Sequence, residues 1–204
     1  MTTTPADLRR RGLRLEYLTI TWNAIEAVVA VAAGIAASSI ALVGFGLDSV
    51  IEGFAASVVI WDLRGVKQER EGRALRLIAI SFFALGAYVV VEALRVLVVG
   101  AQARQSEVGI VLAAVSLVAM VALAAGKRRT GQRLESPTLV ADSAETRLCA
   151  YLSAILLAGL VANATFGWWW ADSLAAVGIA VLALREGREA WRESSEAKES
   201  EDEG

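Results

Sequence analysis

The 204-residue chain contains no histidine and only one cysteine, Cys149. Without histidine, the protein lacks the commonest metal ligand and the side chain that most often carries protons near neutral pH. A single cysteine excludes a disulfide within the chain. There are only two prolines, and charged residues make up 21% of the sequence. These absences exclude a disulfide-stabilised scaffold and leave few charged groups for the surface of an ordinary soluble domain.

Positive charge is not in excess either. The formal net charge is −2, from 20 Lys and Arg against 22 Asp and Glu. Because nucleic-acid binding relies on clustered positive charge, we expect no nucleic-acid partner. What the chain has instead is apolar sequence, with 56% hydrophobic residues and a mean hydropathy of +0.52. This composition is typical of a protein that is surrounded by the lipid bilayer.

Six apolar segments follow one another along the chain. A helix needs about 20 mostly apolar residues to cross about 30 Å of hydrocarbon. The segments closest to this requirement are Tyr17–Ala37, Ile40–Trp61, Leu75–Val99, Val108–Ala125, Leu139–Thr165 and Trp170–Leu184. The loops between them are short, so neighbouring helices should run antiparallel. We therefore predict an all-α membrane protein with six transmembrane helices.

Lys and Arg alternate between the predicted loops. They are concentrated before the first segment, in the second and fourth loops and after the sixth segment, whereas the other three loops have almost none beyond Arg104. Because cytoplasmic loops carry an excess of Lys and Arg, both termini are expected in the cytoplasm. The predicted organisation is a basic cytoplasmic N-terminus (1–15), a transmembrane domain (16–192) and an acidic, disordered tail (193–204).

Acidic residues inside these segments are the strongest functional signal, because charge in hydrocarbon is costly and usually serves a site. The second segment contains Asp48 and Glu52. At a spacing of i, i+4 they share one helix face, ~6 Å apart along the axis. Asp48 lies about nine residues into the segment, ~13 Å deep, and therefore near the bilayer midplane.

The fifth segment repeats this arrangement. Glu145 and Cys149 have the same i, i+4 spacing, and Asp142 lies on the same helix face. With three segments in each half of the chain, the second and fifth run in opposite directions. Transporters built from inverted repeats have this organisation, with a central site near the midplane. We therefore predict that the two pairs meet.

Carboxylates and a thiolate that face one another in apolar surroundings either take up protons or share a divalent cation. Four ligands fit tetrahedral zinc, and sulfur favours a soft or borderline ion over magnesium or calcium. We predict a metal site formed by Asp48, Glu52, Glu145 and Cys149. Zn²⁺ is the favoured ion, and Fe²⁺, Mn²⁺, Co²⁺, Ni²⁺ and Cd²⁺ remain open. The alternative is that protonated carboxyl groups join the helices through hydrogen bonds, with Cys149 acting as a small hydrophobic residue.

The residues around the first pair resemble the cation diffusion facilitator family of divalent-metal transporters. The second span of that family carries a pattern near S-x-A-L-x-A-D-A-x-H/D-S-x-x-D. The segment SSIALVGFGLDSVIE has Glu52 at the last acidic place of this pattern. It keeps the family residues at Ser39, Ala41, Leu42, Asp48 and Ser49.

The resemblance extends to the second pair and covers about residues 16 to 192. The fifth span of the family carries L-x-A-D-A-x-H-x-x-x-D-x-x-x-S. The segment LVADSAETRLCAYLS has Glu145 at the histidine place and Cys149 at the aspartate place. It keeps the family residues at Leu139, Ala141, Asp142 and Ser153.

The resemblance implies a bundle in which the first, second, fourth and fifth helices surround the metal, and the third and sixth form an outer pair. It also implies a homodimer that exports a divalent metal ion in exchange for protons. We expect such an antiporter in the plasma (inner) membrane, with only the transmembrane domain of the family. Asn23, Glu26 and Asp142 are candidate neighbours of the metal ligands or members of a proton pathway. For Glu26, pairing with a polar group on another helix is the alternative.

Two other functions are compatible with parts of the pattern. A non-transporting membrane protein of the same fold would bind metal without moving it. An intramembrane enzyme has less support, because the chain has no histidine and no evident nucleophile–base pair. We therefore expect that the protein is not an enzyme.

Overall fold

The computed structural model describes residues 4–64, 71–99, 104–168 and 170–202, and within them all regular secondary structure is helical. This confirms the predicted all-α fold. The helices are α1 (Pro5–Ala37), α2 (Ile40–Leu63), α3 (Glu71–Val99), α4 (Glu107–Leu134), α5 (Pro137–Phe166) and α6 (Trp170–Asp202). Each of the six predicted apolar segments lies in one of these helices.

Serine residues begin three of the helices. The side-chain oxygens of Ser39, Ser106 and Ser136 accept hydrogen bonds from backbone N–H groups three residues further on, at 3.1, 3.0 and 3.4 Å. Such caps satisfy N–H groups that have no partner within the helix, and an unsatisfied group is especially costly in an apolar environment. They therefore fix the first residues of α2, α4 and α5.

The α1–α2 and α4–α5 connections have the same construction. Ser38 and Glu135 follow the first helix of each pair in the left-handed conformation, with φ of 55° and 54°. In each case a serine cap comes next in the chain, and the second helix then begins. The chain therefore reverses direction in the same way at both places.

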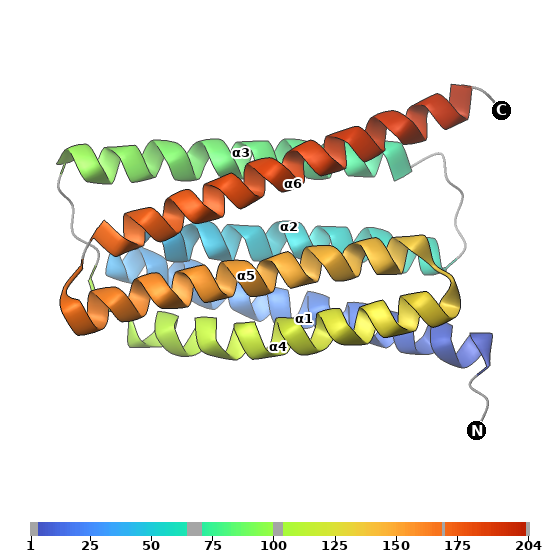
Figure 1. The fold of residues 1–204 in the computed structure, drawn as a ribbon, viewed down its shortest axis with the longest axis horizontal. Helices are drawn as coiled ribbons and strands as arrows, with labels where there is room; N and C mark the ends of the chain where they lie inside the picture. Colours follow the sequence, from blue (N-terminus) through green and yellow to red (C-terminus); the bar gives the residue numbers. More distant parts are fainter. Residues whose placement is uncertain (1–3, 65–70, 100–103, 169, 203–204) are drawn as a thin grey trace.

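A glycine at the same position makes each reversal tight. A Cβ atom on Gly34 would lie 2.8 Å from the backbone nitrogen of Val43, and one on Gly131 would lie 3.0 Å from that of Val140. The two turns lie at opposite ends of the bundle (Figure 1). This is the arrangement expected for two repeats that run in opposite directions.

The helices run along the long axis of the molecule in three layers (Figure 1), formed by α3 with α6, α2 with α5, and α1 with α4. The closest packing joins α3 to α6, α1 to α2 and α4 to α5. The pairing of α3 with α6 agrees with the pair implied by the resemblance. Both α2 and α5 also pack against α6, so the middle layer lies between the other two.

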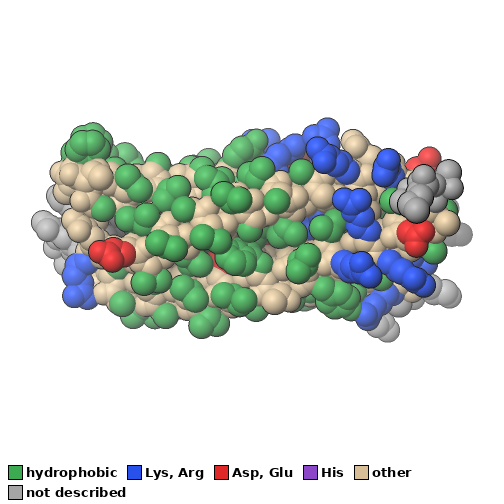
Figure 2. All heavy atoms as spheres, turned by 90° about the horizontal axis from the view of Figure 1, so that it is seen from below, with side chains coloured by type: hydrophobic (Ala, Val, Ile, Leu, Met, Phe, Trp, Pro, Cys, Tyr) green, Lys and Arg blue, Asp and Glu red, His purple; other side chains and the backbone are tan. Residues whose placement is uncertain are grey.

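The outer surface is apolar over most of its length. Figure 2 shows hydrophobic side chains over the middle of the molecule and Lys and Arg gathered toward the end at which the chain begins and ends. Val28, Val98 and Val118 are 72%, 86% and 71% exposed. Such a surface would be unstable in water but suits contact with lipid. The protein is therefore a membrane protein.

Four helices among the described residues have the length and hydropathy of a membrane span: α1, α2, α4 and most of α5. The segments Leu75–Val99 and Trp170–Leu184 are helical, but their role as membrane spans stays a prediction. The cytoplasmic location of the termini also stays a prediction.

At the C-terminal end one expectation differs from the structure, and at the N-terminal end the first helix begins before its apolar segment. α6 continues to Asp202, so the tail predicted to be disordered from residue 193 is helical up to that point. Its Glu, Ala and Lys residues favour helix once a preceding helix has nucleated it. At the other end α1 begins at Pro5, so most of the basic segment 1–15 belongs to the first helix.

Candidate metal site

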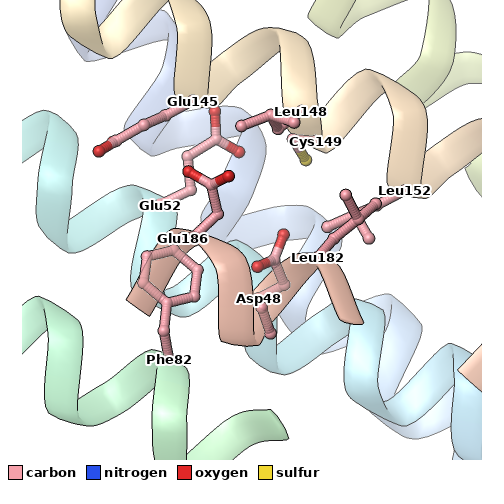
Figure 3. Close-up of a pocket in the computed structure, with 10 residues that line it drawn as sticks. Asp48, Glu52, Phe82, Glu145, Leu148, Cys149, Leu152, Leu182 and Glu186 are labelled. Carbon is pink, nitrogen blue, oxygen red and sulfur yellow. The ribbon is translucent and has the colours of Figure 1, made fainter. Parts of the chain in front are cut away.

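A small cavity of about 20 Å³ lies between α2, α5 and α6 (Figure 3). All four predicted metal ligands line it: Asp48 and Glu52 on α2, and Glu145 and Cys149 on α5. The other described residues that line it are Phe82, Leu148, Leu152, Leu182, Ala183 and Glu186. We call this space the carboxylate cavity. None of its described lining residues carries a positive charge.

The symmetry of the two halves explains why these residues meet. Counted from the two equivalent turns, Asp48 of α2 occupies the same position as Glu145 of α5, and Glu52 the same position as Cys149. α2 and α5 are neighbours in the middle layer and run in opposite directions. Each repeat therefore contributes one pair of ionisable side chains to the same cavity.

Three of the four predicted ligands are deeply buried. Asp48 and Glu52 are each 5% exposed and Cys149 is 2% exposed, whereas Glu145 is partly exposed. Neither carboxylate oxygen of Glu52 has a hydrogen-bond partner among the described residues. In Figure 3 the carboxylates of Asp48 and Glu52 point into the space beside the Cys149 sulfur, while that of Glu145 extends away from them.

The four predicted ligands share the cavity without forming a closed coordination shell. In the described part of the chain, no three His, Cys, Asp or Glu side chains lie close enough together to hold one metal ion. The ligand set from the sequence therefore stays a prediction, although the donor types suit a divalent ion.

Asn23 and Glu26, on α1, lie outside the cavity lining. They are 1% and 0% exposed, and the Glu26 carboxylate lies within reach of Ser116 on α4 and Ser49 on α2, as expected if it pairs with polar groups on other helices. Glu26 is close enough to Glu52 for their carboxylates to interact electrostatically. Glu26 therefore lies between α1 and the cavity residue Glu52, outside the cavity lining.

Asp142 also lies outside the cavity lining and forms part of a different group. It accepts a hydrogen bond from the Lys127 ammonium group at 2.5 Å, and the same ammonium group lies 3.0 Å from a carboxylate oxygen of Glu16. Lys127 also donates to the Thr146 hydroxyl at 3.1 Å. We call Glu16, Lys127 and Asp142 the lysine cluster. It joins α1, α4 and α5, and both Lys127 and Glu16 are 0% exposed.

The lysine cluster and the carboxylate cavity are electrostatic neighbours. Glu52 interacts with both Lys127 and Asp142, and it also lines the cavity. Asp48, on the other side, interacts with Glu186 of α6. A continuous series of ionisable side chains therefore extends from α1 through α4, α5 and α2 to α6.

Sequence reasoning missed Lys127 and Glu186 because it ended their spans too early, and it missed Glu16 because it began the first span too late, at Tyr17. The fourth segment was expected to end at Ala125, but α4 continues to Leu134 and places Lys127 inside the bundle. The sixth was expected to end at Leu184, but α6 continues past Glu186. Lys127 and Glu186 each lie three residues after a buried alanine, but that burial is visible only in the packed bundle, so no signal within the segment identified them.

The chain matches the family described as the cation efflux transmembrane domain over residues 76–197. The match spans more than half of the chain and includes most of α3 and all or most of α4, α5 and α6. A search of curated proteins finds no match. The family match confirms the resemblance, and it includes the second of the two motifs; the first lies before residue 76. The chain therefore belongs to the cation diffusion facilitator family, a family of membrane transporters of metal cations that is not enzymatic in general.

Proposed function

We propose that the protein exports a divalent transition-metal ion through the carboxylate cavity in exchange for protons, with Zn²⁺ as the first ion to test. One observation carries this proposal. Two helices from opposite repeats each bring a pair of ionisable side chains into one buried space. An arrangement that serves only to join helices does not need ionisable groups at matching positions of both repeats.

The chemistry of exchange follows from the donors. Without a cation, carboxyl groups as buried as Asp48 and Glu52 are stable when they hold protons. A divalent ion that enters the cavity offsets the negative charge and displaces those protons. The reverse replacement, by protons from the other side of the membrane, would release the ion. The same side chains thus bind the two exchanged species in turn.

The construction of the bundle supports alternating access. In transporters with inverted repeats, one part of the molecule rocks against the other around a fixed central site. Here α2 and α5 hold the predicted ligands in the middle layer. The end rich in Lys and Arg would face the cytoplasm, with both termini there. We place the protein as a homodimer in the plasma (inner) membrane.

Metal flux into proteoliposomes under an imposed pH gradient tests this function. The wild type should carry Zn²⁺, and the flux should collapse when the gradient is removed. Asp48→Asn and Glu145→Gln should each abolish most of the flux, because each removes a predicted ligand. Glu189→Gln, an exposed position on α6, is the matched control and should leave the flux unchanged.

Two outcomes would contradict the proposal. Unchanged flux in Asp48→Asn and Glu145→Gln would place the transport pathway elsewhere. Stoichiometric metal binding by the wild type without any flux would indicate a non-transporting metal-binding protein of the same fold.

A further inference from the structure

We propose that Glu186 of α6 is a further cation-contacting residue of the carboxylate cavity, an inference that rests on the proposed function. The resemblance to the family implies that α6 belongs to an outer pair, with the metal held by residues of the inner helices. In this chain α6 instead brings a carboxylate into the cavity. The cation would therefore be bound by three helices and not by two.

Glu186 lies on the face of α6 that lines the cavity. Leu182, Ala183 and Glu186 lie on one face of α6, at i, i+1 and i+4, and all three line the cavity. In Figure 3 the Glu186 side chain extends from α6 into the space that Asp48 and Glu52 also line. Glu186 and Asp48 are also close enough to interact electrostatically.

An independent observation indicates that a ligand belongs at this place. Glu52 is 5% exposed, points into the cavity, and has no hydrogen-bond partner for either oxygen among the described residues. A buried polar group without a partner is costly. Glu186 lines the same cavity and supplies a further carboxylate oxygen for a cation that would satisfy Glu52.

The fold itself does not require a carboxylate at position 186. By the same counting that relates Asp48 to Glu145, the residue of α3 that corresponds to Glu186 is Val89. Val89 is 0% exposed and belongs to the apolar core. The charge is therefore present in one repeat only, where it faces the predicted ligands.

Close packing fixes the direction of Glu186. The neighbouring Gly187 lies against α3, and a Cβ atom there would be 3.1 Å from the Phe83 ring. Phe82, the preceding residue, lines the cavity itself. α6 therefore has little freedom to rotate at this point. A cation bound by Glu186 would tie the α3–α6 layer to the α2–α5 layer.

Metal binding to the purified full-length protein in detergent tests the inference, with Zn²⁺ and Cd²⁺ as probes. Glu186→Gln should weaken binding by about 10- to 100-fold, the loss typical when a group that supports a metal site is removed. Glu186→Asp keeps the carboxylate and should recover part of the affinity. Glu189→Gln, exposed on the same helix, should bind as the wild type does.

A second variant tests direct contact. Thiolates are soft ligands that Cd²⁺ favours, and Glu186→Cys would add one beside Cys149. If Glu186 touches the ion, the sulfur-to-cadmium absorption of the Glu186→Cys complex should exceed that of the wild-type complex, because a thiolate has been added to the ligands. A role in helix packing alone would leave this absorption unchanged.

The outcomes separate this inference from the function on which it rests. If the wild type bound neither ion, the proposed function and this inference would fail together. If the wild type bound both ions, Asp48→Asn lost binding, and Glu186→Gln bound as tightly as the wild type, this inference alone would fail. Unchanged cadmium absorption in Glu186→Cys would overturn it even where Glu186→Gln did not fold.

Discussion

The lysine cluster and the carboxylate cavity are both buried in the bundle, but only the first contains a cation among its described residues. In the lysine cluster, the ammonium group of Lys127 lies 3.0 Å from Glu16 and 2.5 Å from Asp142. In the cavity, Asp48, Glu52 and their neighbours have no Lys or Arg among the described lining residues. The lysine cluster therefore holds its cation within its own residues, whereas the lining of the cavity offers acidic and sulfur donors to an ion that enters.

This difference predicts different effects of substitution. Removing one partner of a buried ion pair leaves an uncompensated charge, which destabilises the fold. Removing a carboxylate of the cavity breaks none of the ion pairs of the lysine cluster, so its cost should appear mainly in cation binding. Substitutions in the lysine cluster should therefore lower the stability of the fold, whereas substitutions in the cavity should lower the affinity for the cation. The three predictions below test this division, in order of decreasing effect.

Lys127→Met should have the largest effect. It leaves Glu16 and Asp142 buried without their shared cation, and the free energy of unfolding should fall by about 3–5 kcal/mol. Unfolding of the purified protein in detergent, followed by helical circular dichroism, measures the change. Arg128→Met is the matched control, since Arg128 is the next residue on α4 and is exposed. Equal stability of the two variants would contradict the role of Lys127 in compensating the charge of the two carboxylates.

A combined variant separates charge from packing at Lys127. Glu16→Met and Asp142→Leu, added to Lys127→Met, replace the whole cluster by apolar side chains. Such replacements of buried ionic groups are often neutral or stabilising, so most of the lost stability should return. If the triple variant unfolds as easily as Lys127→Met, the loss came from packing of the long lysine side chain.

Glu52→Gln should show the opposite pattern. Because neither Glu52 oxygen has a hydrogen-bond partner among the described residues, stability without metal should change by less than about 1 kcal/mol. The affinity for Zn²⁺ should fall by more than the about 10- to 100-fold typical of groups that only support a ligand. Titration calorimetry and thermal unfolding of the same sample measure both. A large loss of stability with unchanged affinity would reverse the comparison.

The positions of the helices along the chain could be predicted from sequence because hydropathy and helical spacing are local properties. Each of the six apolar segments lies within one helix of the described part of the chain. The ends of α4 and α6 could not be predicted in this way. Hydropathy records the cost of contact with lipid, whereas Lys127 and Glu186 face other helices. A polar residue inside the bundle therefore does not mark the end of a helix.

The candidate site was likewise predictable only in part. The i, i+4 spacing of Asp48 with Glu52, and of Glu145 with Cys149, predicted two faces, and the equivalent turns bring those faces to one cavity. Nothing local predicts that α6 adds Glu186. Its direction depends on how α6 rotates against α3, which the close approach of Gly187 to Phe83 determines. Long-range packing of this kind has no signature within a single segment.

Cys149→Ser should have the smallest effect and concerns selectivity within the cavity. Cys149 is 2% exposed and a serine has nearly the same size, so the fold should remain intact. Sulfur is the softest donor near the cavity, and its loss should reduce the preference for Cd²⁺ and Zn²⁺ over Mn²⁺ by about tenfold. A competition series of divalent ions on the purified protein measures this ratio. Cys149→Asp, which supplies a hard oxygen donor, should move it further toward Mn²⁺. If both variants keep the ratio of the wild type, Cys149 acts only as a small hydrophobic residue, and the cation is held by the carboxylates alone.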